Sequence, residues 1–163
     1  MNNQKPSKYL VNNILFCTDF SENAEFAFDF ALESGYCRGG CTLYLLHVIP
    51  ESAAQFWKTY IYEVEGIDEK ARADIDAVID RQYRPRVPEG LDFQVEIRVG
   101  KDYTKILEFA REKDIDLIVI GRTGRSAIEK AFFGNVTEKI ARKADCAVLV
   151  VPLSFEKKLS AKD

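Results

Sequence analysis

The chain has 163 residues, the size of one ordinary domain with a hydrophobic core. Its composition, 47% hydrophobic and 30% charged residues, is typical of a soluble globular protein and excludes a disordered or membrane-embedded chain. A formal net charge of −3 argues against binding of nucleic acid through bulk charge.

The N-terminal sequence MNNQKPSKYLVNN is polar and lacks the apolar stretch of a signal peptide. No apolar run reaches the roughly 18 residues that are needed to cross a bilayer. We therefore expect a cytoplasmic protein without membrane contact, in which the four cysteines are reduced thiols. The sequence predicts a single domain with a core of about residues 9–152, and loose ends over residues 1–8 and 153–163.

Five short runs are predicted strands. Four of them are almost continuously apolar, as strands are when helices cover both faces of a parallel sheet. The third run alternates between apolar and polar residues, which favours a place at an edge of the sheet. The five runs cover residues 13–17, 42–48, 93–99, 116–120 and 147–151.

Between these strands, apolar residues recur at helical spacing. Ser21 is expected to cap a first helix that ends near Gly35, and Asp102 to cap the third helix. A second helix is predicted over about residues 58–84. The order βαβαβαβαβ predicts an open parallel α/β sheet with helices on both faces. The positions expected to face inward are Tyr103, Ile106, Leu107 and Ala110 in the third helix, and Val136, Ile140, Ala141 and Ala144 in the last.

Residues 121–135, GRTGRSAIEKAFFGN, place three glycines and three cationic side chains between the fourth strand and the last helix. The segment matches neither a Walker A loop nor a dinucleotide fingerprint. If the sheet begins in its middle, the first and fourth strands are neighbours. Thr18 and Asp19 then meet this segment at the switch point, where open α/β sheets bind ligands. The glycines could let the backbone approach an anion beside the next helix, or could simply form a turn.

The spacing of Gly121, Gly124 and Gly134, followed by Asn-Val-Thr, resembles the G-2x-G-9x-G-(S/T) motif of the universal stress protein family. The stretches ILFCTDFSENAEFA and TLYLLHVIPE resemble the first two strands of that family. The likeness covers about residues 9–152. It implies a Rossmann-like sheet of five parallel strands in the order 3-2-1-4-5, and a homodimer formed through the last strand, Cys146 to Val151.

Members of that family with the glycine motif bind ATP, so the resemblance implies an adenine nucleotide, ATP with Mg²⁺, as the ligand. Asn135 departs from the motif, which has Ser or Thr at this place. Asn caps a helix equally well, and its amide carries two donors. By resemblance, the nucleotide contacts fall on Thr18, Asp19, Val48, Ile120, Gly121, Gly124, Arg125, Gly134, Asn135, Val136 and Thr137.

Other residues of chemical interest have less specific interpretations. His47 is interpreted as a hydrogen-bonded sheet residue, because no nucleophile or partner accompanies it. Cys37 and Cys41 could form a redox pair or half of a metal site, but no second Cys or His pair completes a zinc site, and we predict no metal ligands. The aromatic segment around Trp57 could form a lid, contact a dimer partner or pack within the domain.

The hypothesis favoured by the sequence is a nucleotide-dependent regulatory or stress-response module that acts as a homodimer. The alternative is a nucleotide-free dimeric interaction protein of the same fold. A third hypothesis is a nucleotide-using transferase or hydrolase. No general base for phosphoryl transfer is evident, and the resemblance implies at most slow ATP hydrolysis, so the sequence leaves enzymatic activity open.

Overall fold

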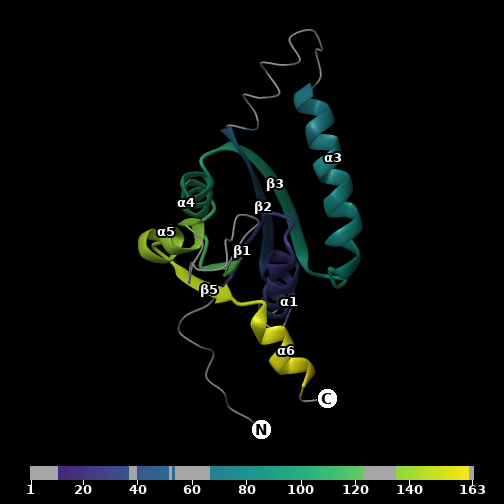
Figure 1. The fold of residues 1–163 in the computed structure, drawn as a ribbon, viewed down its shortest axis with the longest axis vertical. Coiled ribbons are helices and arrows are strands. Elements are labelled where there is room, and N and C mark those ends of the chain that lie inside the picture. The colour runs from purple at the N-terminus through teal and green to yellow at the C-terminus, as the bar shows by residue number, and fades with distance from the viewer. Residues whose placement is uncertain (1–10, 37–39, 52, 54–66, 123–134, 162–163) are drawn as a thin grey trace.

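Five parallel strands form one sheet in the order β3-β2-β1-β4-β5 in the computed structural model of the chain (Figure 1). The structure describes residues 11–36, 40–51, 53, 67–122 and 135–161. The predicted α/β sheet with order 3-2-1-4-5 is confirmed, including the place of the third strand at an edge. The strands are β1 (Asn13–Thr18), β2 (Thr42–Pro50), β3 (Asp92–Gly100), β4 (Leu117–Gly121) and β5 (Ala147–Val151).

Helices cover both faces of this sheet (Figure 1). One face carries α1 (Glu22–Tyr36) and α3 (Ile67–Gln82), and the other carries α4 (Asp102–Glu112) and α5 (Asn135–Lys143). A short 3₁₀ helix, η1 (Arg84–Arg86), follows α3, and α6 (Ser154–Ser160) follows β5.

The continuous apolar runs in the sequence arise because each strand supplies two cores. Side chains alternate along a strand, so Ile14 and Phe16 of β1 pack in the core beneath α1, and Leu15 and Cys17 pack in the core beneath α4. All four side chains are buried. A strand that is covered on both faces cannot alternate between apolar and polar residues, which is why the sequence pattern reveals it.

Two predicted helix caps have different outcomes. Ser21 caps α1 as expected, because its Oγ accepts a hydrogen bond from the Ala24 N–H at 3.3 Å. The prediction that Asp102 caps α4 is wrong. A capping residue lies outside the helix in an extended conformation, and here Lys101 holds that position with φ −79° and ψ 121°. Asp102 is already the first helical residue, so its carboxylate lies one position too late to act as the cap.

The inward face of α5 also differs from the prediction at two positions. Ala141 is exposed, whereas Thr137, not expected inward, is buried with Ile140. The Thr137 hydroxyl donates a hydrogen bond to the Gly121 carbonyl at 3.1 Å, so the polar group is satisfied where it is buried. Tyr103 is half-buried: it packs against the core beneath α4, as predicted, while its ring also faces lysine side chains.

The segment after β5 was predicted to be loose, but it forms α6. This helix is anchored by Phe155, whose ring centroid lies 6.0 Å from that of Phe30 on α1. The aromatic contact supplies the apolar burial that the segment's charged sequence does not reveal. Among the helices in the described ranges, none has the length and apolar character needed to cross a membrane.

Candidate functional site

The topology places the ends of β1 and β4 side by side at the carboxyl edge of the sheet. Cys17 pairs with Ile120 in parallel register, so Thr18 and Gly121 end neighbouring strands. The chain leaves β1 into α1 on one face and leaves β4 into α5 on the other. This is the switch point that the sequence predicted, and in open α/β sheets it is where ligands bind.

The turn after β1 is held together by side-chain hydrogen bonds. The Asp19 carboxylate accepts the Ser21 N–H at 3.0 Å and the Ser21 hydroxyl at 2.5 Å. The Thr18 Oγ1 accepts the Phe20 N–H at 2.9 Å, and Phe20 has a φ of 62°, in the left-handed region that a bulky residue rarely adopts. These bonds fix the backbone on both sides of Asp19 at the strand end.

The Thr18 side chain points away from the switch point into the first core. Its Oγ1 lies 2.7 Å from the Oη of Tyr83, and both residues are buried. Burial raises the pKa of the Tyr83 phenol to about 12, and the hydrogen bond to Thr18 acts in the opposite direction. The sequence contained no signal for this pair, because the two residues are 65 positions apart. We expect Thr18 to face a ligand through its backbone alone.

His47 is a hydrogen-bonded sheet residue, as interpreted from the sequence. Its Nδ1 lies 2.8 Å from the Thr18 carbonyl oxygen. A carbonyl oxygen can only accept, so Nδ1 carries the proton. The Phe20 ring covers the imidazole, with ring centroids 4.5 Å apart.

Asp102 lies at the same edge of the sheet, and sequence reasoning did not count it among the candidate site residues. It is half-buried at the start of α4, and burial raises the pKa of its carboxyl group. The charges of His47 and Asp19 act on the same group, the first lowering and the second raising its pKa. These opposing effects agree with the place of Asp102 at the edge where the parallel strands end. Its place two residues after β3 could have revealed this, because all the parallel strands end at one edge.

Gly121 has a structural reason to be glycine. A Cβ atom at this position would lie 2.9 Å from both the backbone carbon and the oxygen of Asn23 on α1. The absence of a side chain therefore lets the first turn of α1 lie against the end of β4. The Gly121 carbonyl accepts the Thr137 hydroxyl, which fastens α5 to the same point.

Some of the other residues singled out in the sequence are described by the structure, and others are not. Ile120 is buried and Val48 half-buried near the carboxyl ends of their strands. Helix α5 is described from Asn135 onward, and the bond from Thr137 to Gly121 holds this part of the helix at this edge. Gly124, Arg125, Gly134, Cys37 and Trp57 lie outside the described residues.

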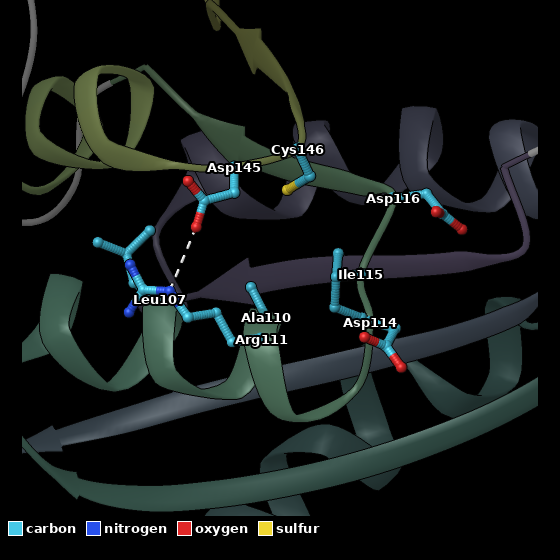
Figure 2. A pocket seen from close by; sticks show the side chains of 8 residues that line it. All are labelled: Leu107, Ala110, Arg111, Asp114, Ile115, Asp116, Asp145 and Cys146. Carbon is cyan, nitrogen blue, oxygen red and sulfur yellow. Dashed lines mark hydrogen bonds and ion pairs between the residues drawn. The ribbon is translucent and has the colours of Figure 1, made fainter.

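A separate cavity of about 370 Å³ lies at the opposite end of the sheet, where β4 and β5 begin (Figure 2). Two of the three carboxylates that line the cavity form hydrogen bonds or ion pairs. Asp116 accepts the Asn12 and Asn13 N–H groups at 2.8 and 3.0 Å, and Asp145 pairs with Arg111 at 3.3 Å. The cavity is lined by Leu107, Ala110, Arg111, Asp114, Ile115, Asp116, Asp145 and Cys146.

The chemistry of this cavity does not favour catalysis. Burial, with Asp116 and Asp145 nearby, raises the pKa of the Cys146 thiol, so the thiol stays protonated and weakly nucleophilic. Within the described part of the chain, no group of three His, Cys, Asp or Glu side chains could hold a metal ion.

The fold and the switch point define a doubly wound α/β protein with its candidate site between β1 and β4. The chain belongs to the universal stress protein family, whose model matches residues 11–152. It is 30% identical over 142 residues to a putative universal stress protein of Staphylococcus haemolyticus, covering 85% of this chain and 83% of the relative.

Solved structures show the same fold. The universal stress protein UspA from Lactobacillus plantarum has a TM-score of 0.69 and 26% sequence identity, over 88% of this chain and 99% of that one. A universal stress protein from Archaeoglobus fulgidus, solved in complex with dAMP, has a TM-score of 0.57 and 21% identity, over 87% of this chain and 98% of that one.

Proposed function

We propose that this protein binds an adenine nucleotide, ATP with Mg²⁺, at the carboxyl ends of β1 and β4, and acts as a cytoplasmic nucleotide-dependent regulatory module. The observation that carries the proposal is the meeting of Asp19, the end of β4 and the first turn of α5 at the switch point. A nucleotide needs a polar group for its ribose or base and donors for its phosphates, and this edge offers both.

The residues present fit the two ends of such a ligand. The Asp19 carboxylate, held by Ser21, can accept hydrogen bonds from ribose hydroxyls, and Val48 offers an apolar contact for a base. Asn135 is the first described residue of α5, and the N–H groups at the start of a helix suit a phosphate. Magnesium would neutralise phosphate charge.

The family relationship supports this proposal. The Archaeoglobus relative is a complex with dAMP, an adenine nucleotide, and it shares the fold of this chain. The glycine spacing of residues 121–134 gives further support by resemblance. The hydroxyls of Thr18 and Thr137 have internal partners, so the proposal assigns ligand contacts at these positions to the backbone.

Calorimetric titration of the full chain with Mg-ATP tests the proposal, together with chromatography of small molecules released on denaturation. We expect saturable binding that weakens about tenfold in Asp19→Asn, because a carboxylate acceptor becomes a neutral amide. Ser21→Ala is the matched control, since it loosens the same turn but keeps the carboxylate, and it should bind nearly as well as the wild type.

Two results would contradict the proposal. One is no heat of binding at about millimolar nucleotide, a limit that corresponds to roughly −4 kcal/mol, together with no released nucleotide. The other is equal weakening in Asp19→Asn and Ser21→Ala, which would assign the effect to the turn. A chain that is dimeric and does not bind nucleotide would instead fit the alternative, a nucleotide-free interaction protein.

A further inference from the structure

The outer surface of α4 and α5 carries a concentration of positive charge that the proposed nucleotide site does not use. The ammonium groups of Lys101, Lys139 and Lys143 lie 5.0, 4.7 and 5.4 Å from the centroid of the Tyr103 ring. We call these four residues the lysine cluster. Lys101 precedes α4, and the other two lysines lie one turn apart on α5.

The cluster stands out because the other cations on these helices are paired. Lys105 pairs with Glu108 at 2.8 Å, Arg111 with Asp145 at 3.3 Å and Arg142 with Glu138 at 3.2 Å. None of the ion pairs formed within the described ranges includes a lysine of the cluster.

The ring is a weak counterpart for three charges. A tyrosine face attracts an ammonium group, but its quadrupole does not neutralise the repulsion among several of them. All three nitrogens lie within 5.4 Å of one point, which is inside the Debye length of about 8 Å at physiological salt, so their charges act together. The pKa of the Tyr103 phenol is lowered by hydrogen bonds from Lys101 and Thr104 and by the nearby ammonium charges.

We propose that the lysine cluster is a binding site for a compact polyanion of the phosphate class, formed by residues that the proposed nucleotide site does not use. Three cations that converge on one ring match a group with several negative charges on adjacent phosphates. An acidic peptide spreads its carboxylates along a backbone, so fewer of them could reach the three ammonium groups at once. The phosphates can come from free inorganic polyphosphate or from the phosphate chain of a nucleotide.

Titration of the full chain with inorganic tripolyphosphate at low salt tests this proposal. We expect saturable binding that weakens about tenfold in Lys101→Gln/Lys139→Gln/Lys143→Gln, because three charge-assisted contacts are lost. The matching triple Arg variant keeps the charges and should bind like the wild type. The matched control is Lys113→Gln/Lys157→Gln/Lys158→Gln, which removes three exposed charges elsewhere and should bind nearly as well as the wild type. Circular dichroism checks that each variant is folded. The single variant Lys143→Gln should lose less affinity for tripolyphosphate than the triple Gln variant does.

Adenosine and ATP distinguish the source of the phosphates and separate this proposal from the nucleotide site. One outcome is that the triple Gln variant binds both ATP and tripolyphosphate more weakly than the wild type and binds adenosine equally well. That result would show that the phosphate chain of a nucleotide reaches the cluster. If the affinity for ATP is the same in the variant and the wild type, the cluster binds free polyphosphate. The proposal is overturned if the wild type shows no saturable tripolyphosphate binding, or if the control variant loses as much affinity as the triple Gln variant. It is also overturned if Gly124→Val abolishes tripolyphosphate binding while the triple Gln variant retains it.

Discussion

Gly121 shows that one residue can serve the fold and border the candidate site. Its missing Cβ lets the first turn of α1 approach the end of β4, and its carbonyl receives the Thr137 hydroxyl. The glycine pattern in the sequence indicated a close approach of some group at this point. The structure identifies one such group as the backbone of Asn23, whether or not a nucleotide also lies nearby.

Gly121→Ala should therefore lower the free energy of unfolding. The new Cβ would lie 2.9 Å from backbone atoms of Asn23, which cannot move without displacing α1. Overpacking of this kind costs about 1–3 kcal/mol. Gly35→Ala is the control, because its Cβ would meet side-chain ends, Leu91 at 3.2 Å and Ile14 at 3.8 Å, and no backbone, and alanine favours a helix. Urea unfolding measures both, and equal stability of the two variants would contradict the prediction.

Tyr83 makes stability depend on pH in the alkaline range. Its folded-state pKa, about 12, lies above the ordinary value of 10.0 because the ring is buried. The neutral phenol is therefore favoured by folding, and this contribution is fully present below pH 10.0. It is lost as the pH rises from 10.0 through 12, because the unfolded chain releases the proton first.

Tyr83→Phe should change stability in two ways. At neutral pH we expect a loss of about 1 kcal/mol, because the Thr18 hydroxyl loses its buried partner. Above pH 10, the stability of the variant should fall less steeply with pH than that of the wild type, since the titrating group is gone. Urea unfolding at a series of pH values tests both expectations, and parallel pH profiles would show that Tyr83 does not carry the dependence.

At the scale of elements, the buried contact of α3 lies near its C-terminal end. The helix has 16 residues, and the fully buried side chain among those described is Ile79, near its C-terminal end. Ile75 and Val78 are half-buried, and the other described positions earlier in the helix are mostly exposed. The helix therefore depends on its last turns, where the chain continues into η1 and the buried Tyr83.

Ile79→Ala should be far more destabilising than Val78→Ala. Removal of a fully buried isoleucine side chain leaves a cavity and costs about 2–5 kcal/mol. The half-buried Val78 can lose its methyl groups with a smaller penalty, on the order of 1 kcal/mol. Hydrogen exchange should show that amides of α3 lose protection first in Ile79→Ala. Equal effects of both substitutions would mean that α3 is held along its length.

Across the whole molecule, the sequence predicted the features that depend on periodicity. Strands covered on both faces are continuous apolar runs, so the sheet and its layers could be predicted. The sequence did not predict the features that depend on which face of a helix turns inward or on contacts between residues far apart in the chain. Thr137 faces inward with Ile140 and forms a hydrogen bond to Gly121, while Ala141 faces outward, and α6 carries an aromatic contact from Phe155 to Phe30. The place of Asp102 at the edge that also holds His47 could have been predicted from its position after β3, because all the parallel strands end at that edge.

Strand β5 forms one edge of the sheet. Among the described strands it pairs only with β4, and its residues Ala147 to Val150 are exposed or half-buried although all four are apolar. Unpaired apolar edges are usually covered, and a second copy of the chain could cover this one. A homodimer through β5 is therefore our proposal for the assembly.

Sedimentation of the wild type at tens of micromolar protein should show a dimer. Ala147→Lys places a charge on the exposed edge and should shift the population toward the monomer while the fold is kept, since this side chain is exposed. Gln94→Lys places the same charge on β3, at the opposite edge of the sheet, and should remain dimeric. A monomeric wild type, or a dimer disrupted by Gln94→Lys but not by Ala147→Lys, would show that β5 does not form the interface.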